Sequence, residues 1–102
     1  MEWTRSGDDI FVRLDIGEEI HTSLQALAEE ANFDAAAITS GIGRTRENVY
    51  GFMDESQKYH RFDLPAASEL VSLQGNLARH EDGTPFTHIH ATFTADDCDV
   101  HG

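Results

Sequence analysis

The sequence has few of the features that mark secreted or membrane proteins. It contains a single cysteine, Cys98, so no disulfide can form within the chain. The apolar runs are short and interrupted by aspartate and glutamate, which argues against a transmembrane helix. The opening residues, MEWTRSGDD, have neither the basic nor the apolar segment of a signal peptide. We therefore expect a cytoplasmic protein that does not use a membrane as a partner.

Lysine is also scarce. Lys58 is the only one, and the chain carries 19 acidic residues against 7 lysines and arginines, a formal net charge of −12. This charge repels phosphate, so we do not expect nucleic acid to be a partner of this chain alone. The excess of carboxylates has two interpretations: adaptation to a salt-rich cytoplasm, where ions screen their repulsion, or an ordinary acidic cytosolic protein.

The chain is short. Its 102 residues are enough for one compact domain, residues 1–102, and too few for two. A domain of this size buries only about 60–70% of the surface that its unfolded chain exposes, so its own core is modest. Association with further copies could complete the burial.

Two periodicities divide the sequence. The segment DIFVRLDIG alternates apolar and polar residues, as a half-buried strand does. Across residues 18–31 the apolar side chains recur every three to four positions, which predicts the one main helix. The segments with strand character after it are AAAITSGIG, ENVYGFMD, QKYHRFDL, SELVSLQGNLAR and PFTHIHATFT. We predict an α+β fold with a predominantly antiparallel sheet of about six to seven strands.

Both ends of this strand series carry turn signals. Gly41 and Gly43 bracket the end of AAAITSGIG, where we expect a tight connection or a close backbone approach. The last segment, ADDCDVHG, has the composition of a turn, and the sequence stops at Gly102 before a further strand. We expect the domain to lack its C-terminal strand, which leaves the preceding strand as an edge unless another subunit covers it.

The most distinctive polar pattern is the pair His88 and His90 within PFTHIHATFT. In a strand, residues i and i+2 lie on one face, about 6.6 Å apart along the chain. Two imidazoles at this spacing can converge on one ion, since Zn–N bonds are about 2.0–2.1 Å long. Imidazole suits zinc and other divalent transition metals, and a catalytic type of zinc site has a third protein ligand. The alternative is two polar side chains on a solvated sheet face.

The candidate for the third ligand is His101, which a hairpin could bring towards the pair. The sequence does not fix the register of that hairpin. The other histidines have less support as ligands, because His21 lies on the predicted helix, His60 in a strand and His80 in a polar turn.

Four motifs, in this order and spacing, resemble the plants-and-prokaryotes conserved (PPC or PCC) domain family, which also occurs in plant AT-hook nuclear proteins. They are RLDIGEEI, SGIG, SELVSLQGNLA, and PFTHIHATF followed by an acidic turn and HG. The resemblance covers the chain from about Arg13 to Gly102. It implies an α/β domain with a mainly antiparallel sheet that assembles as a homotrimer.

The resemblance also implies that His88 and His90 join a third histidine to hold a metal, usually zinc. In the family this histidine follows a Gly-Gly pair, and Gly102 matches the first of those glycines. Because the sequence stops there, we expect either that it is part of a longer protein or that His101 takes the place of the third ligand. His101 falls three positions earlier and would face the opposite side of a regular strand.

Three functions remain open. The first is a homotrimeric metal-binding module with a regulatory or small-ligand role, and this is our prediction. The second is DNA binding, although the sequence has no AT-hook RGRP, no lysine cluster, and only Arg44 and Arg46 as a local basic pair. The third is a zinc-dependent enzyme with Glu69 or Asp63 as its base, although no phosphate-binding glycine loop or CxxC pair is present. We expect no catalytic residue.

If the chain is adapted to a salt-rich cytoplasm, its thermal unfolding midpoint rises between dilute buffer and molar KCl. Added ions screen the repulsion among the carboxylates, and this repulsion weakens the compact state. Circular dichroism measures the midpoint at each salt concentration. Equal stability at both extremes would remove the hypothesis of salt adaptation.

Overall fold

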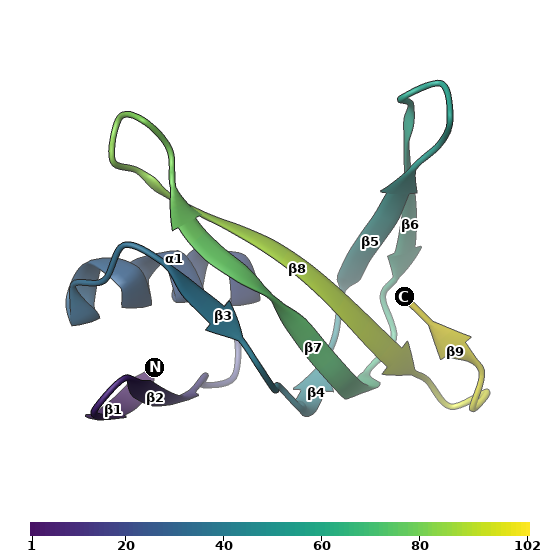
Figure 1. Ribbon diagram of the computed structural model, residues 1–102. Helices are drawn as coiled ribbons and strands as arrows, with labels where there is room; N and C mark the ends of the chain where they lie inside the picture. The colour runs from purple at the N-terminus through teal and green to yellow at the C-terminus, as the bar shows by residue number, and fades with distance from the viewer. The chain divides into compact units, whose positions relative to one another are not determined.

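The computed structural model describes residues 1–102 and contains one helix and nine short strands (Figure 1). The helix is α1 (Ile20–Ala31), and it is neither long nor apolar enough to cross a membrane. The strands are β1 (Glu2–Ser6), β2 (Asp9–Arg13), β3 (Ala36–Ile38), β4 (Gly43–Thr45), β5 (Asn48–Met53), β6 (Tyr59–Leu64), β7 (Ser68–Arg79), β8 (Pro85–Thr94) and β9 (Val100–His101). One helix with mostly antiparallel strands confirms the predicted α+β class.

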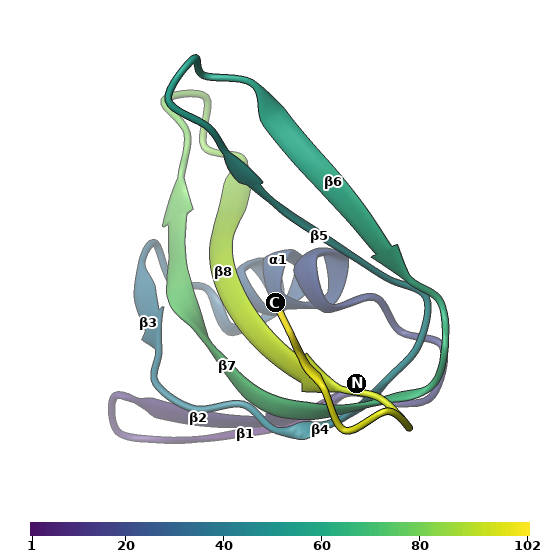
Figure 2. The ribbon, with the colours of Figure 1, turned by 90° about the vertical axis from the view of Figure 1, so that its right-hand side faces the viewer.

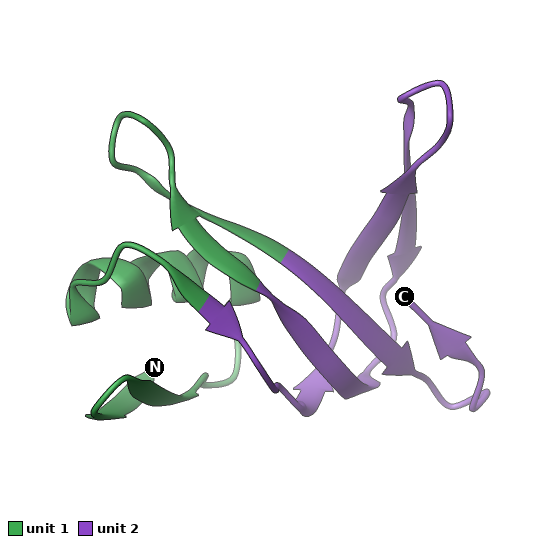
Figure 3. Cartoon of the chain, in the orientation of Figure 1, with its two compact units in different colours: residues 1–36, 76–88 green, residues 37–75, 89–102 purple.

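The strands form three sheets. β1 pairs with β2 and β5 with β6, each as an antiparallel two-stranded ribbon, while the largest sheet has the order β3–β7–β8–β9 with β4 also paired to β7. The chain divides into two compact units, which Figure 3 colours separately. Unit 1 is residues 1–36 and 76–88, and unit 2 is residues 37–75 and 89–102. The single domain expected over residues 1–102 remains a prediction.

The helix of unit 1 is capped at both ends. The Glu19 carboxylate accepts hydrogen bonds from the backbone N–H groups of His21 and Thr22, so α1 begins two residues later than predicted. At the other end Asn32 has a left-handed backbone (φ 57°), and its N–H donates to the Ala28 carbonyl. The buried apolar side chains of unit 1 are Leu24, Leu27, Ala28, Ala31 and Leu77. The helical ones form the stripe that the periodicity predicts.

The first strand of unit 1 was not predicted. The segment DIFVRLDIG contains β2, which pairs with β1 from Glu2↔Arg13 to Ser6↔Asp9. All five residues of β1 are exposed and most are polar, so β1 lacks the alternation that marks a half-buried strand.

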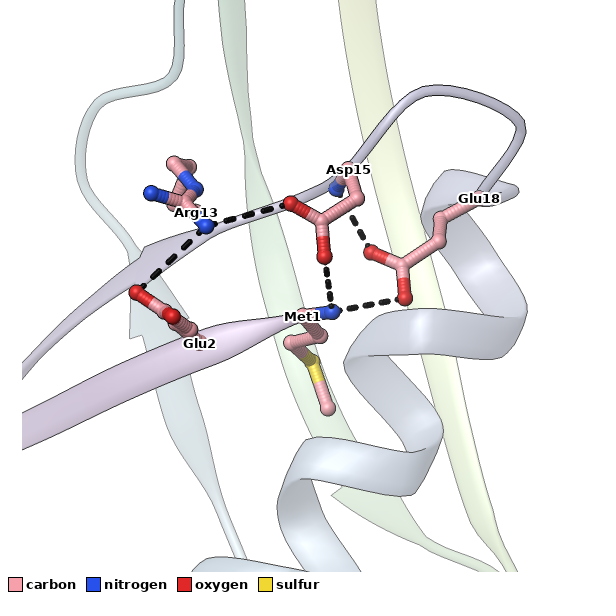
Figure 4. A network of polar contacts seen from close by, with 5 residues as sticks. All are labelled: Met1, Glu2, Arg13, Asp15 and Glu18. Carbon is pink, nitrogen blue, oxygen red and sulfur yellow. Dashed lines mark hydrogen bonds and ion pairs between the residues drawn. The ribbon is translucent and has the colours of Figure 1, made fainter.

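A network of charges joins the start of β1 to the loop before α1 (Figure 4). The Met1 ammonium lies 2.7 Å from Glu18 Oε1 and 2.9 Å from Asp15 Oδ2. Arg13 lies 3.2 Å from Asp15 and 3.4 Å from Glu2. Hydrogen bonding to Glu18 and Asp15 raises the pKa of the Met1 ammonium, and the same bonds lower the pKa of both carboxyls. Asp15 and Glu18 therefore hold the N-terminus against the loop before α1.

Arg79, at the end of β7, ties the C-terminal end of α1 to the β7–β8 turn. Its guanidinium donates to the Ala28 carbonyl (3.3 Å), which also accepts the Asn32 N–H, and to the Phe33 carbonyl just past the helix (2.9 Å). It also donates to the Gly83 carbonyl (2.9 Å) and pairs with Glu29. Only 19% of this side chain is exposed, so water cannot easily replace it.

Unit 2 has a small core and two glycines in tight places. Its buried apolar side chains are Leu70, Leu73 and Phe93. A Cβ at Gly41 would lie 3.0 Å from the Leu73 Cβ, which confirms the close backbone approach expected of this glycine. A Cβ at Gly51 would lie 2.0 Å from the His60 carbonyl oxygen, so β5 and β6 leave no room for a side chain there.

The predicted hairpin of unit 2 is present. β5 and β6 run side by side (Figure 2), with a register from Asn48↔Leu64 to Met53↔Tyr59. Tyr50, Phe52 and Phe62 reach the same face of the ribbon because side chains alternate along each strand. The hairpin therefore has one face with three aromatic side chains and one face of mixed character, which includes Tyr59.

The segment ADDCDVHG, predicted as a turn, ends in a short strand, whereas the lack of a C-terminal strand stays a prediction. The turn predicted in ADDCDVHG is followed by β9, whose register with β8 is Phe93↔His101 and Thr94↔Val100. Two residues after an acidic turn have no periodicity, so no sequence pattern indicates this strand. β9 is short, and its register with β8 covers Phe93 and Thr94.

Arg79→Met removes the charged donor and keeps much of the side-chain length. We expect the free energy of unfolding to fall by about 2 kcal/mol, because hydrogen bonds to charged groups contribute about 1.5–3 kcal/mol. Denaturant unfolding measures this loss. The matched control is Arg13→Met, since Arg13 is 60% exposed and its ion pairs should contribute less than about 1 kcal/mol. Equal losses in the two variants would contradict the role given to Arg79.

Candidate functional site

The histidine pair lies on β8. His88 and His90 are exposed and Ile89 between them is half-buried. This alternation is that of a regular strand, which places the two imidazoles on one face and Ile89 on the other. The geometry required of a two-histidine clamp is therefore present along this strand, and metal binding by the pair remains a prediction.

His101 lies on the other face of the strand pair. It is directly opposite Phe93 in the β8–β9 register, and directly opposed residues share a face. Phe93 and His90 are three positions apart, so they point to opposite faces. The His101 Nε2 atom lies 3.4 Å from Asp97 Oδ2. Within its own chain, His101 is not placed beside His90.

The donors on one chain fit part of a zinc shell. Two exposed imidazoles at i and i+2 suit two ligand positions, and imidazole is a common zinc ligand. No group of three or more histidine, cysteine, aspartate or glutamate side chains lies close enough together in this chain to hold a metal ion. A complete shell needs at least one ligand from outside the chain.

Glu69 and Asp63, the two residues considered as catalytic bases, are paired with residues of neighbouring strands. Glu69 of β7 is opposite Arg44 of β4, and Asp63 of β6 is opposite Val49 of β5. Neither belongs to a cluster with the histidines. Cys98 is exposed in the turn before β9, where its φ is 61°.

A hollow of about 250 Å³ in unit 2 was not predicted. Its lining residues are Tyr50, Gly51, Phe52, Phe62, Val100, His101 and Gly102. The rings of Tyr50 and Phe62 stack with their centroids 5.9 Å apart, and Tyr50 lies 6.1 Å from Phe93. The alternation of aromatic residues on both hairpin strands was the sequence signal for such a face.

Asp54 organises the tip of the hairpin. Its Oδ1 accepts hydrogen bonds from the Ser56 hydroxyl (2.7 Å) and from the backbone N–H groups of Ser56 (2.9 Å) and Lys58 (3.0 Å). Its Oδ2 lies 2.6 Å from His60 Nε2, and the His60 ring stacks on Phe52 at 5.2 Å. The His60 contact and these hydrogen bonds lower the Asp54 pKa to about 2.

Two further histidines have packing roles in unit 1. His21 Nδ1 lies 2.5 Å from Thr87 Oγ1, which also accepts a hydrogen bond from Gln25 at 3.3 Å. These contacts link α1 to β8. His80 stacks on Phe86 with 4.6 Å between the ring centroids.

These features define a small α+β domain of antiparallel strands with a histidine pair on one strand. The chain belongs to the plants and prokaryotes conserved (PCC) domain family, whose model matches residues 1–102. The resemblance seen in the sequence is thereby confirmed. None of the curated proteins matches the chain.

Solved structures agree with this assignment. A metal-containing protein from Archaeoglobus fulgidus is 36% identical with a TM-score of 0.79, over 89% of this chain and 64% of that one. A plant- and prokaryote-conserved protein from Pyrococcus horikoshii is 29% identical with a TM-score of 0.80, over 87% and 62%. A provisionally assigned DNA-binding protein from Bacteroides thetaiotaomicron shares the fold, at 22% identity and a TM-score of 0.89, over 98% and 69%. The chain spans about two-thirds of the length of these structures.

The Asp54 carboxyl should titrate near pH 2 and depend on His60. Its pKa is lowered from 3.8 to about 2, so its contribution to hairpin stability is present above pH 3.8 and is lost as the pH falls through about 2. Carboxyl-carbon NMR measures the titration. In His60→Ala the Asp54 midpoint should move back towards 3.8. An Asp54 midpoint near 3.8 in the wild-type chain would contradict this description.

Proposed function

We propose that the chain is a metal-binding module that assembles as a homotrimer and has a regulatory or small-ligand role. In this proposal His88 and His90 of each copy are two ligands of a divalent transition-metal ion, with zinc as the first candidate. The supporting observation is that β8 carries both imidazoles exposed at i and i+2. The metal-containing Archaeoglobus fulgidus protein, 36% identical to this chain, gives the proposal independent support.

The remaining ligands come from outside the pair. Zinc sites use three or four protein ligands, with water completing the shell in the three-ligand case. Because His101 lies on the face opposite His90, it serves as a ligand only when another copy presents it. A bound zinc ion would join copies or polarise a ligand oxygen, and the contribution of this chain is to hold two donors on a regular strand.

A short edge strand and exposed apolar side chains support the homotrimer. β9, the edge strand beside β8, has only two residues, and sheet edges are commonly covered by another chain. Large apolar side chains are exposed, among them Phe11 at 75% and Ile42 at 79%. Such exposure is typical of protein surfaces that contact a partner.

DNA binding and zinc-dependent catalysis have less support. The provisionally assigned DNA-binding neighbour is only 22% identical, a level that carries the fold alone. The net charge of −12 opposes phosphate binding, and Arg44 of the one local basic pair lies opposite Glu69. Catalysis would need a base beside the histidines, and neither Glu69 nor Asp63 is grouped with them.

Elemental analysis combined with native mass spectrometry tests the proposal. We expect a trimer with one zinc ion per chain, and we expect His88→Ala and His90→Ala each to weaken zinc binding at least about tenfold. His80→Ala is the matched control, because His80 stacks on Phe86 and should leave zinc affinity unchanged.

His101→Ala distinguishes between two ways of completing the zinc shell. It weakens zinc binding if a neighbouring copy supplies His101, and it has no effect if water or a carboxylate completes the shell. A monomeric chain, or zinc affinity unchanged in both His88→Ala and His90→Ala, would contradict the proposal.

A further inference from the structure

The β5–β6 hairpin has two different faces. The Phe62 face carries Tyr50, Phe52, His60 and Phe62, and Tyr50 lies 6.1 Å from Phe93 of β8. Because side chains alternate across a ribbon, the other residues face away from Phe93. We call these residues the Met53 face: Val49, Gly51, Met53, Tyr59, Arg61 and Asp63.

The Met53 face combines three exposed apolar side chains with one cation and one anion, Arg61 and Asp63. Val49, Met53 and Tyr59 are 59%, 60% and 53% exposed, and Met53 is directly opposite Tyr59. The Arg61 guanidinium lies 5.9 Å from the centre of the Tyr59 ring, so one cation borders the apolar side chains. An isolated two-stranded hairpin is at best marginally stable in water, so a ribbon with such a face gains stability when it is covered.

Charge sets this part of the chain apart. Residues 37–67, which include the hairpin, contain four of the seven cationic residues and four of the nineteen acidic ones. This segment therefore has no net charge, while the rest of the chain carries the whole formal charge of −12. The exposed apolar residues of the Met53 face thus lie within a neutral segment of a strongly acidic protein.

We infer that the Met53 face is a contact surface for a second copy of this chain. This inference rests on the proposed homotrimer and specifies which surface the copies use. Two chains of charge −12 repel one another, so they can approach closely only through a surface with little net charge and apolar area to bury. A basic partner would instead be attracted to the acidic remainder of the chain, and nucleic acid would be repelled by it.

The exposed apolar residues of unit 1 do not meet these conditions. Phe11 is 75% exposed, more than Met53, but it belongs to a ribbon whose surroundings include Asp8, Asp9 and Asp15. Exposure alone does not select a surface, because Ile16 (96%) and Ile42 (79%) are more exposed than either residue. The Met53 face differs in bringing three exposed apolar side chains together within a neutral segment. Phe11 and Met53 form a matched pair for an experiment.

Sedimentation velocity over a range of concentrations tests the inference with Met53→Lys and Phe11→Lys. We expect Met53→Lys to raise the concentration for half-assembly at least about tenfold, as the loss of a central interface residue does. Phe11→Lys should leave it within about threefold. Circular dichroism verifies that each variant is folded, and Val49→Lys replaces Met53→Lys if that variant does not fold.

Salt gives a second readout. Raising KCl should strengthen the assembly, since it screens the repulsion between acidic copies and leaves an apolar contact intact. Assembly that weakens with salt would overturn the inference, because it would indicate contacts made mainly by ion pairs.

The outcomes separate this inference from the proposed function. A wild-type chain that stays monomeric overturns both. A wild-type trimer that Met53→Lys and Val49→Lys leave intact overturns this surface and leaves the homotrimer standing. Dissociation by Phe11→Lys as strong as that by Met53→Lys also overturns it, because the effect would then not be specific to the Met53 face.

Discussion

The alternation of side chains along β8 is the constraint on which the candidate site depends. The same two-residue period that buries Phe93 presents His88 and His90 to the exposed face. Through the pairing of β8 with β9, the period also directs His101 to the side of Phe93. The alternation along β8 therefore places His88 and His90 on one face and His101 on the other.

Charge is the second constraint, and it acts on association more than on folding. The ion pairs of the chain are mostly local and exposed, such as those of Met1 with Asp15 and Glu18, and pairs of this kind contribute little to stability. The uncompensated carboxylates instead limit where another acidic chain can approach. Under the proposed function, metal binding would favour assembly, since a cation shared between copies would offset part of their repulsion.

Much of the fold could be predicted because its longer elements have strong periodicity. The apolar stripe from Leu24 to Ala31, the β5–β6 hairpin and the long strands β7 and β8 all followed from pattern alone. β1 and β9 were missed because the first is exposed throughout and the second has only two residues. Neither contains the contrast between buried and exposed positions from which a strand is recognised.

The candidate site was predictable only in part, for a physical reason. The i, i+2 spacing of His88 and His90 is a local property, and sequence is sufficient to find it. The face occupied by His101 depends on the register of β9, which a short acidic turn does not encode. The aromatic hollow and the Asp54–His60 contact likewise depend on how side chains meet across the hairpin.

The lack of a side chain at Gly51 limits which amino-acid substitutions the hairpin can accept during evolution. A Cβ there would meet the His60 carbonyl oxygen at 2.0 Å, so any other residue would push the two strands of the ribbon apart. The surface positions on either side can exchange one residue for another without disturbing the backbone. Substitutions at Gly51 are therefore excluded by sterics, whereas the exposed side chains on both faces of the hairpin can be replaced.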